Sequence, residues 1–133
     1  MPKARNCQER CRQVLAWLEE EWPCGRTVIL EWAPEVVEID TTTGKKHQCY
    51  GETWRDGRVM RIVLSLRCCR KWKDATATLI HEYVHAMFWG PARIEFDERV
   101  NHHPMAFYVQ EGEILDRWNH DHGAEQASEY PVG

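Results

Sequence analysis

The pattern of apolar and polar positions predicts three amphipathic helices, because apolar side chains recur at about every third or fourth position. We expect these helices at residues 6–22, 74–89 and 103–118. Asp74 has the side chain of a helix N-cap, which accepts hydrogen bonds from the first free amides of a helix. From residue 119 the sequence turns polar and acidic, so residues 119–133 are expected to form a loose tail.

Between the first two helices the pattern changes to that of β-strands. Residues 27–32 are rich in β-branched and aromatic side chains, and residues 35–39 favour a second short strand. Residues 47–54 and 59–66 predict a hairpin, because Asp56-Gly57 between them is a strong turn signal. We therefore predict an α+β fold, in which a small antiparallel sheet packs with the N-terminal helix, the second helix and a C-terminal helix.

Length and composition favour a globular protein. The chain has 133 residues and a net charge of -4, which suits a single domain, 1–133, with one core. It has no apolar run of about 18 residues and no apolar segment behind its N-terminus, so neither a membrane span nor a secretory signal is expected. Its six cysteines lack C-x-x-C spacing, which favours reduced thiols, a cytoplasmic location and no separate zinc ribbon. Cys7 and Cys11, four residues apart, are interpreted as small buried side chains.

Positive charge is concentrated in residues 43–73. This segment has nine Lys and Arg against Glu52 and Asp56, a balance of +7 on an acidic chain. One interpretation is a site for single-stranded DNA, with Trp54 and Trp72 as stacking platforms. The other is the solvated face of a sheet, with both Trp side chains packed in the core.

The strongest chemical signal is His81-Glu82-Tyr83-Val84-His85, an H-E-x-x-H pattern inside the second predicted helix. Residues four apart lie on one helix face, so His81 and His85 form half of a tetrahedral zinc site. Glu82 is then placed to act as the general base on metal-bound water. The alternative is a chance match on an ordinary amphipathic helix.

A catalytic zinc needs a third protein ligand. The metzincin pattern is excluded, because Phe88 and Pro91 stand where it requires Gly and His. The remaining candidates follow the motif and belong to the last predicted helix or its start: Glu111, Glu113, His102 and His103.

The order of motifs resembles the SprT-like/Spartan metalloprotease family. A Thr- and Ala-rich lead-in at residues 75–80 precedes His-Glu-x-x-His-Ala, and a polar stretch leads to His103-Pro104-Met105-Ala106-Phe107. The family's late motif is typically His-Gly-x-x-Phe, and its His is the third zinc ligand. The resemblance spans residues 10–118 and implies a zincin-like fold. It also implies zinc held by His81, His85 and His103.

The resemblance further implies a zinc endopeptidase that cleaves protein substrates with Glu82 as the catalytic residue. Pro104 stands where the family's late motif has Gly, and this departure leaves His102 as an alternative to His103 as the third ligand. The 133 residues lack the paired cysteines of the zinc ribbon that many relatives have, so we expect a weaker transfer of their DNA-linked role. The competing function is a non-catalytic, zinc-stabilised module that binds nucleic acid or protein. A compact microbial protein, or a phage protein in its host's cytoplasm, would suit this short form.

Other side chains of the same types are expected to have structural or surface roles. Tyr83 and Tyr108 could donate a hydrogen bond to the reaction, but we expect both to pack. The remaining histidines, expected at the surface, are His47, His120 and His122.

Overall fold

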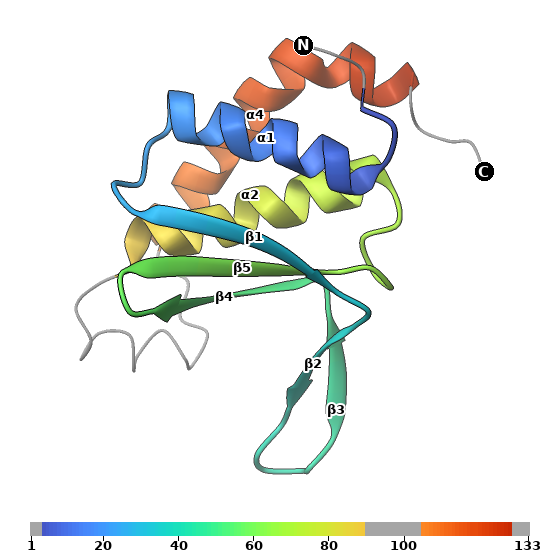
Figure 1. The fold of residues 1–133 in the computed structure, drawn as a ribbon, viewed down its shortest axis with the longest axis vertical. Coiled ribbons are helices and arrows are strands. Elements are labelled where there is room, and N and C mark those ends of the chain that lie inside the picture. Colours follow the sequence, from blue (N-terminus) through green and yellow to red (C-terminus); the bar gives the residue numbers. More distant parts are fainter. Residues whose placement is uncertain (1–3, 90–104, 129–133) are drawn as a thin grey trace.

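The computed structural model describes residues 4–89 and 105–128, and it confirms the α+β class (Figure 1). In chain order the elements are α1 (Cys7–Glu21), β1 (Thr27–Ala33), β2 (Val36–Ile39), β3 (Lys46–Cys49), β4 (Gly51–Asp56), β5 (Val59–Ser65), α2 (Trp72–Phe88) and α4 (Met105–Ser128). Among these helices, none has both the length and the apolar character needed to cross a lipid bilayer.

Three strands form a mixed sheet in the order β1-β5-β4. β4 and β5 form the predicted antiparallel hairpin, whose turn consists of Gly57 and Arg58, with Gly57 at a φ of 65°. β1 instead runs parallel to β5, from Thr27 opposite Val59 to Ala33 opposite Ser65. The prediction of an antiparallel sheet is therefore wrong for β1. Its pairing is long-range, because β2, β3 and β4 lie between the two strands in the chain, and no local turn signal reports it.

β2 and β3 form a separate antiparallel hairpin, which projects from the sheet as an arm (Figure 1). The predicted strand 47–54 is consequently two strands, broken at Tyr50 where the chain passes from the arm into β4. Near the tip of the arm, the carboxylate of Asp40 accepts hydrogen bonds from the amides of Thr42 and Thr43 at 2.8 and 3.2 Å. These bonds stabilise the ionised form and lower the pKa of Asp40.

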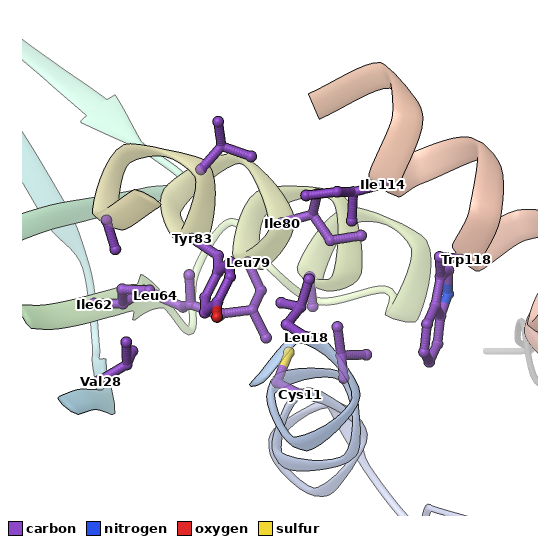
Figure 2. Packing of buried hydrophobic residues seen from close by; sticks show 14 of the residues in the cluster. Cys11, Leu18, Val28, Ile62, Leu64, Leu79, Ile80, Tyr83, Ile114 and Trp118 are labelled. Atoms are coloured by element: carbon purple, nitrogen blue, oxygen red, sulfur yellow. The ribbon is translucent and has the colours of Figure 1, made fainter. Parts of the chain in front are cut away.

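All three helices lie on one face of the three-stranded sheet, and α2 is the central one (Figure 1). Figure 2 shows apolar side chains meeting around α2 from the sheet, from α1 and from α4. The contributors that it labels outside α2, all nine-tenths or more buried, are Cys11, Leu18, Val28, Ile62, Leu64, Ile114 and Trp118. The motif helix is thus packed from several sides, which fixes the direction in which its remaining face points.

The helix boundaries follow local signals in only some cases. α1 begins as predicted, with the Asn6 side chain accepting a hydrogen bond from the Glu9 amide at 2.8 Å. α2 begins earlier than predicted, with Lys71 as an N-cap that makes no side-chain cap bond. Asp74 is therefore not the N-cap. It lies in the first turn, where its charge still complements the helix dipole.

α4 continues to Ser128, so the loose tail predicted from residue 119 is wrong for residues 119–128. His122 stacks on Trp118 with ring centroids 4.1 Å apart, and it also contacts Trp17. The ring of His122 therefore extends the packed face of the helix, while the side chain stays partly exposed, which agrees with the expected surface histidine. The predicted helix start at His103-Pro104 lies outside the described residues.

A buried arginine joins α1, α2 and α4. The side chain of Arg10 is fully buried, and its guanidinium lies 5.4 Å from the ring centre of Trp72 and 4.9 Å from that of Trp118. It also donates to the side chain of Gln13 at 3.3 Å. Cation–π contacts with two rings offset part of the cost of burying the charge.

Candidate functional site

The H-E-x-x-H residues lie within α2, as predicted. Four residues apart on one helix, His81 and His85 project from the same side, and their ring centroids are 5.0 Å apart. Both side chains are partly exposed, whereas Glu82 between them is buried at 6 % exposure. The helix therefore brings two imidazoles and one carboxylate together at the edge of the core.

Glu82 is held by Thr53 on the neighbouring strand β4. The Thr53 hydroxyl donates to Oε1 of Glu82 at 2.6 Å and also lies 3.0 Å from the main-chain carbonyl oxygen of Glu82. Burial raises the pKa of the Glu82 carboxyl, while the Thr53 hydrogen bond and the neighbouring His81 act in the opposite direction. Sequence analysis missed Thr53, whose contact with Glu82 spans 29 positions.

Helix α4 contacts the two histidines from the other side. The ring of Phe107 lies 5.1 Å from His81 and 4.6 Å from His85, measured between centroids. One turn further along α4, Oε2 of Glu111 lies 2.7 Å from Nδ1 of His81. Neither contact was predicted, although the spacing of Phe107 and Glu111 puts them on one helical face.

A pocket of about 340 Å³ lies next to the motif. Small side chains on two elements form much of its wall: Gly51 on β4, and Ala77 and Thr78 on α2. His81 and Glu82 line one part of it, and the half-exposed Tyr50 lies where β4 begins. Two residues of the H-E-x-x-H motif therefore lie beside an open cavity.

Gly51 allows β4 to approach α2 closely. A Cβ atom at this position would lie 2.9 Å from both Leu64 Cδ2 and Thr78 Cγ2, and 3.1 Å from the Val63 carbonyl oxygen. We expect Gly51→Ala to lower the free energy of unfolding by about 1–3 kcal/mol, because overpacking forces the strand and the helix apart. Urea denaturation followed by tryptophan fluorescence measures this loss.

Gly112→Ala on α4 is the matched control. A Cβ at Gly112 has no atom within 4 Å, so the added methyl group meets nothing. Within a helix, Ala is more stable than Gly by roughly 0.5–1 kcal/mol, so this variant is expected to be at least as stable as the wild type. Equal stability of Gly51→Ala and the wild type would contradict the close approach of β4 to α2.

Of the four candidates for a third ligand, two are described. Glu111 is engaged with His81, and Glu113 is exposed on α4. His102 and His103 lie outside the described residues. Within residues 4–89 and 105–128, no group of three or more His, Cys, Asp and Glu side chains is arranged to hold a metal ion.

The expected packing role of Tyr83 agrees with its position. Tyr83 is buried and donates to the main-chain oxygen of Trp22 at 2.8 Å, so burial raises the pKa of its phenol. Tyr108 is half-exposed beside Phe107. His47 and His120 are exposed on β3 and α4, as predicted.

The six cysteines are free thiols, and Cys11 is fully buried. Cys7, one turn earlier on α1, is partly buried, and its thiol lies 3.5 Å from the Arg70 carbonyl oxygen. Burial raises the pKa of both thiols. These features fit the interpretation of the pair as packed side chains.

The basic residues of the segment 43–73 are spread over the arm, the β4–β5 hairpin, the connection between β5 and α2, and the first turn of α2. Arg61 is paired with Glu31 and Asp56 at 2.9 and 2.8 Å. Of the two tryptophans, Trp72 lies against Arg10, whereas Trp54 is 37 % exposed. Because the charges are dispersed and partly paired, the case for a DNA site is weaker than the case for the α2 site.

Comparison with known protein families, with curated proteins and with solved structures finds no match.

Proposed function

We propose that the chain is a zinc-dependent endopeptidase with a zincin-like fold. Its metal ligands would be His81, His85 and His103, and its general base would be Glu82. The observation that carries the proposal is that the His81 and His85 rings lie 5.0 Å apart, while His81 and Glu82 line a pocket. His103 enters through the resemblance to the SprT-like/Spartan family, with His102 as the alternative.

The donor set suits zinc, which binds imidazole nitrogen at about 2.0–2.1 Å in tetrahedral sites. Two imidazoles that share one such ion have ring centroids about 5 Å apart, by the same geometry. The separation of 5.0 Å between His81 and His85 agrees with this value. A histidine that binds zinc commonly donates its other ring nitrogen to a carboxylate, as His81 can do to Glu111.

In the proposed reaction, bound zinc would polarise the scissile carbonyl and increase the acidity of water. Glu82 takes a proton from the attacking water and passes it to the nitrogen of the leaving amine. The hydrogen bond from Thr53 to Oε1 fixes the orientation of this carboxylate before a substrate arrives.

A peptide substrate is favoured because β4 is an edge strand, with β5 on one side and no described strand on the other. The Ser65 amide donates to the Tyr50 carbonyl at 2.8 Å, so alternate residues from Tyr50 onward form the hydrogen-bonded pairs with β5. The residues between them, Gly51 and Thr53, direct their backbone amide and carbonyl groups away from β5. An extended peptide can pair with these groups next to Glu82.

The position of the pocket at the Gly51 end of β4 indicates which side of the scissile bond would occupy it. An antiparallel peptide would run from the Arg55 end of β4 towards Gly51, so the residues after the scissile bond reach the pocket. The methyl groups of Ala77 and Thr78 in its wall favour an apolar side chain there. We therefore expect cleavage before apolar residues in extended, unfolded segments.

The test is digestion of an unfolded protein by the metal-free chain and by the zinc-reconstituted chain. We expect cleavage only with zinc, loss of cleavage on chelation and recovery when zinc is added again. Mass spectrometry of the products shows whether apolar residues follow the cut bonds. Cleavage that continues unchanged in excess chelator would reject the zinc mechanism.

The alternative is a zinc-stabilised binding module without catalysis. A purely structural site is closed by four protein ligands and has no use for a carboxylate beside an open position. Glu82, held by Thr53 and lining the pocket, favours the enzyme. Zinc bound by four protein ligands, together with no cleavage of any unfolded substrate, would establish the module.

A further inference from the structure

The face of α4 that docks on the protein contains one acidic residue among apolar ones. Phe107, Ile114 and Trp118 are buried, with exposures of 1 %, 0 % and 0 %. Glu111 lies four residues after Phe107 and three before Ile114, so helical geometry puts it on the same face. A carboxylate there loses hydration and raises the free energy of the folded state unless a partner compensates it.

The partner is His81. Oε2 of Glu111 lies 2.7 Å from Nδ1 of His81, and the two side chains are 18 % and 31 % exposed. A carboxylate oxygen accepts hydrogen bonds, so the ring proton belongs on Nδ1. In the neutral imidazole the lone pair is then on Nε2, and a metal is coordinated through the nitrogen that carries the lone pair.

Phe107 adds a steric constraint from the same helix. Its ring contacts both His81 and His85, so neither imidazole can rotate towards α4 without meeting it. Two residues one turn apart on α4 therefore contact the motif histidines: Phe107 lies against both rings, and Glu111 hydrogen-bonds to His81.

We propose that Glu111 is a positioning residue that holds His81 with its proton on Nδ1, so that Nε2 binds the metal. This inference rests on the proposed zinc site and deepens it. It assigns Glu111 to the hydrogen bond and not to the metal, which leaves the third coordination position to a residue such as His103. The hydrogen bond also makes the ring a stronger ligand, because the carboxylate stabilises the positive charge that metal binding draws onto it.

The experiment measures the zinc dissociation constant of the full chain by competition with a chromophoric chelator. Loss of an outer carboxylate partner typically weakens metal binding by about 10–100-fold, which we expect for Glu111→Ala. Glu111→Gln should lose less zinc affinity than Glu111→Ala, because its amide oxygen still accepts a hydrogen bond from Nδ1 of His81. The matched control is Glu113→Gln, an exposed residue on the same helix, whose affinity should equal that of the wild type.

A second readout does not involve the metal. In the metal-free protein, nitrogen NMR of the His81 ring should show the proton on Nδ1 in the wild type and in Glu111→Gln. In Glu111→Ala it should show a shift towards the Nε2-protonated form. Circular dichroism of each variant checks the fold, and a merely structural role for Glu111 would leave the tautomer unchanged.

The outcomes separate this inference from the proposed function. A wild-type chain that binds no zinc would end both. Zinc affinity and tautomer unchanged in Glu111→Ala would overturn the positioning role alone, while zinc-dependent cleavage would still stand. A third measurement replaces zinc by cobalt and records the visible absorption spectrum, which reports the coordination number of the metal. A coordination number that changes in both Glu111 variants would make Glu111 a ligand and would overturn the inference.

Discussion

Replacing Glu82 by Gln is expected to reduce proteolysis by about 10²–10⁴-fold while the fold and the bound zinc are kept. Gln is nearly the same size and can still accept the hydrogen bond that Thr53 donates to Oε1, so the packing of α2 is preserved. It cannot take a proton from water, and the proposed reaction loses its general base. The measurement is the initial rate of cleavage of an unfolded protein, at equal zinc content.

Glu113→Gln is the control for this substitution too, because it makes the same chemical change on an exposed side chain away from the pocket. We expect it to retain the wild-type rate. Full activity in Glu82→Gln would end the proposal that this motif is catalytic. Loss of zinc or of helical structure in Glu82→Gln would instead assign Glu82 a structural role.

Trp118→Ala is expected to lower the free energy of unfolding by about 3–5 kcal/mol. Trp118 is fully buried, packs against Trp17 at 5.1 Å, stacks on His122 and lies beside the guanidinium of Arg10. Truncation would leave a cavity and would remove one of the two rings that surround a buried positive charge. The midpoint of urea unfolding, monitored by circular dichroism, reports the change.

Trp54→Ala provides the comparison for Trp118, because it removes an indole that is 37 % exposed on β4. Trp54→Ala should lower the free energy of unfolding by much less than Trp118→Ala, since part of the Trp54 surface is already in water. Two variants that unfold at the same urea concentration would contradict the docking of α4 through Trp118. Because α4 also contributes Phe107 and Glu111, we expect Trp118→Ala to weaken zinc binding as well.

The parts of the fold that depend on local signals could be predicted from the sequence. The start of α1 follows from Asn6, and the β4–β5 hairpin follows from Asp56-Gly57. The parallel partner of β1 could not be predicted, because strand alternation is the same for parallel and antiparallel pairing. The continuation of α4 beyond residue 119 was missed because its polar sequence gives little apolar periodicity, and the packing of His122 on Trp118 is a tertiary contact.

The candidate site divides in the same way. His81 and His85 could be predicted as a pair because residues four apart lie on one helix face, and Glu82 follows as the next residue of the same motif. Thr53 and Glu111 reach the motif across 29 and 30 positions of sequence, and no local rule connects them. The one available signal was the position of Glu111 in the apolar stripe of the last helix, where an acidic residue indicates a buried partner.

The parallel pairing of β1 with β5 also determines the order in which the protein can assemble during synthesis. α1 and β1 are made first, but their partners α2 and β5 are made later. The contiguous unit from β4 to α2 relies on short-range contacts and can form early, whereas β1 must close a long loop to reach it. The apolar residues of the N-terminal quarter therefore stay unpartnered on the ribosome until β5 and then α2 have emerged, and this is the stage most exposed to aggregation.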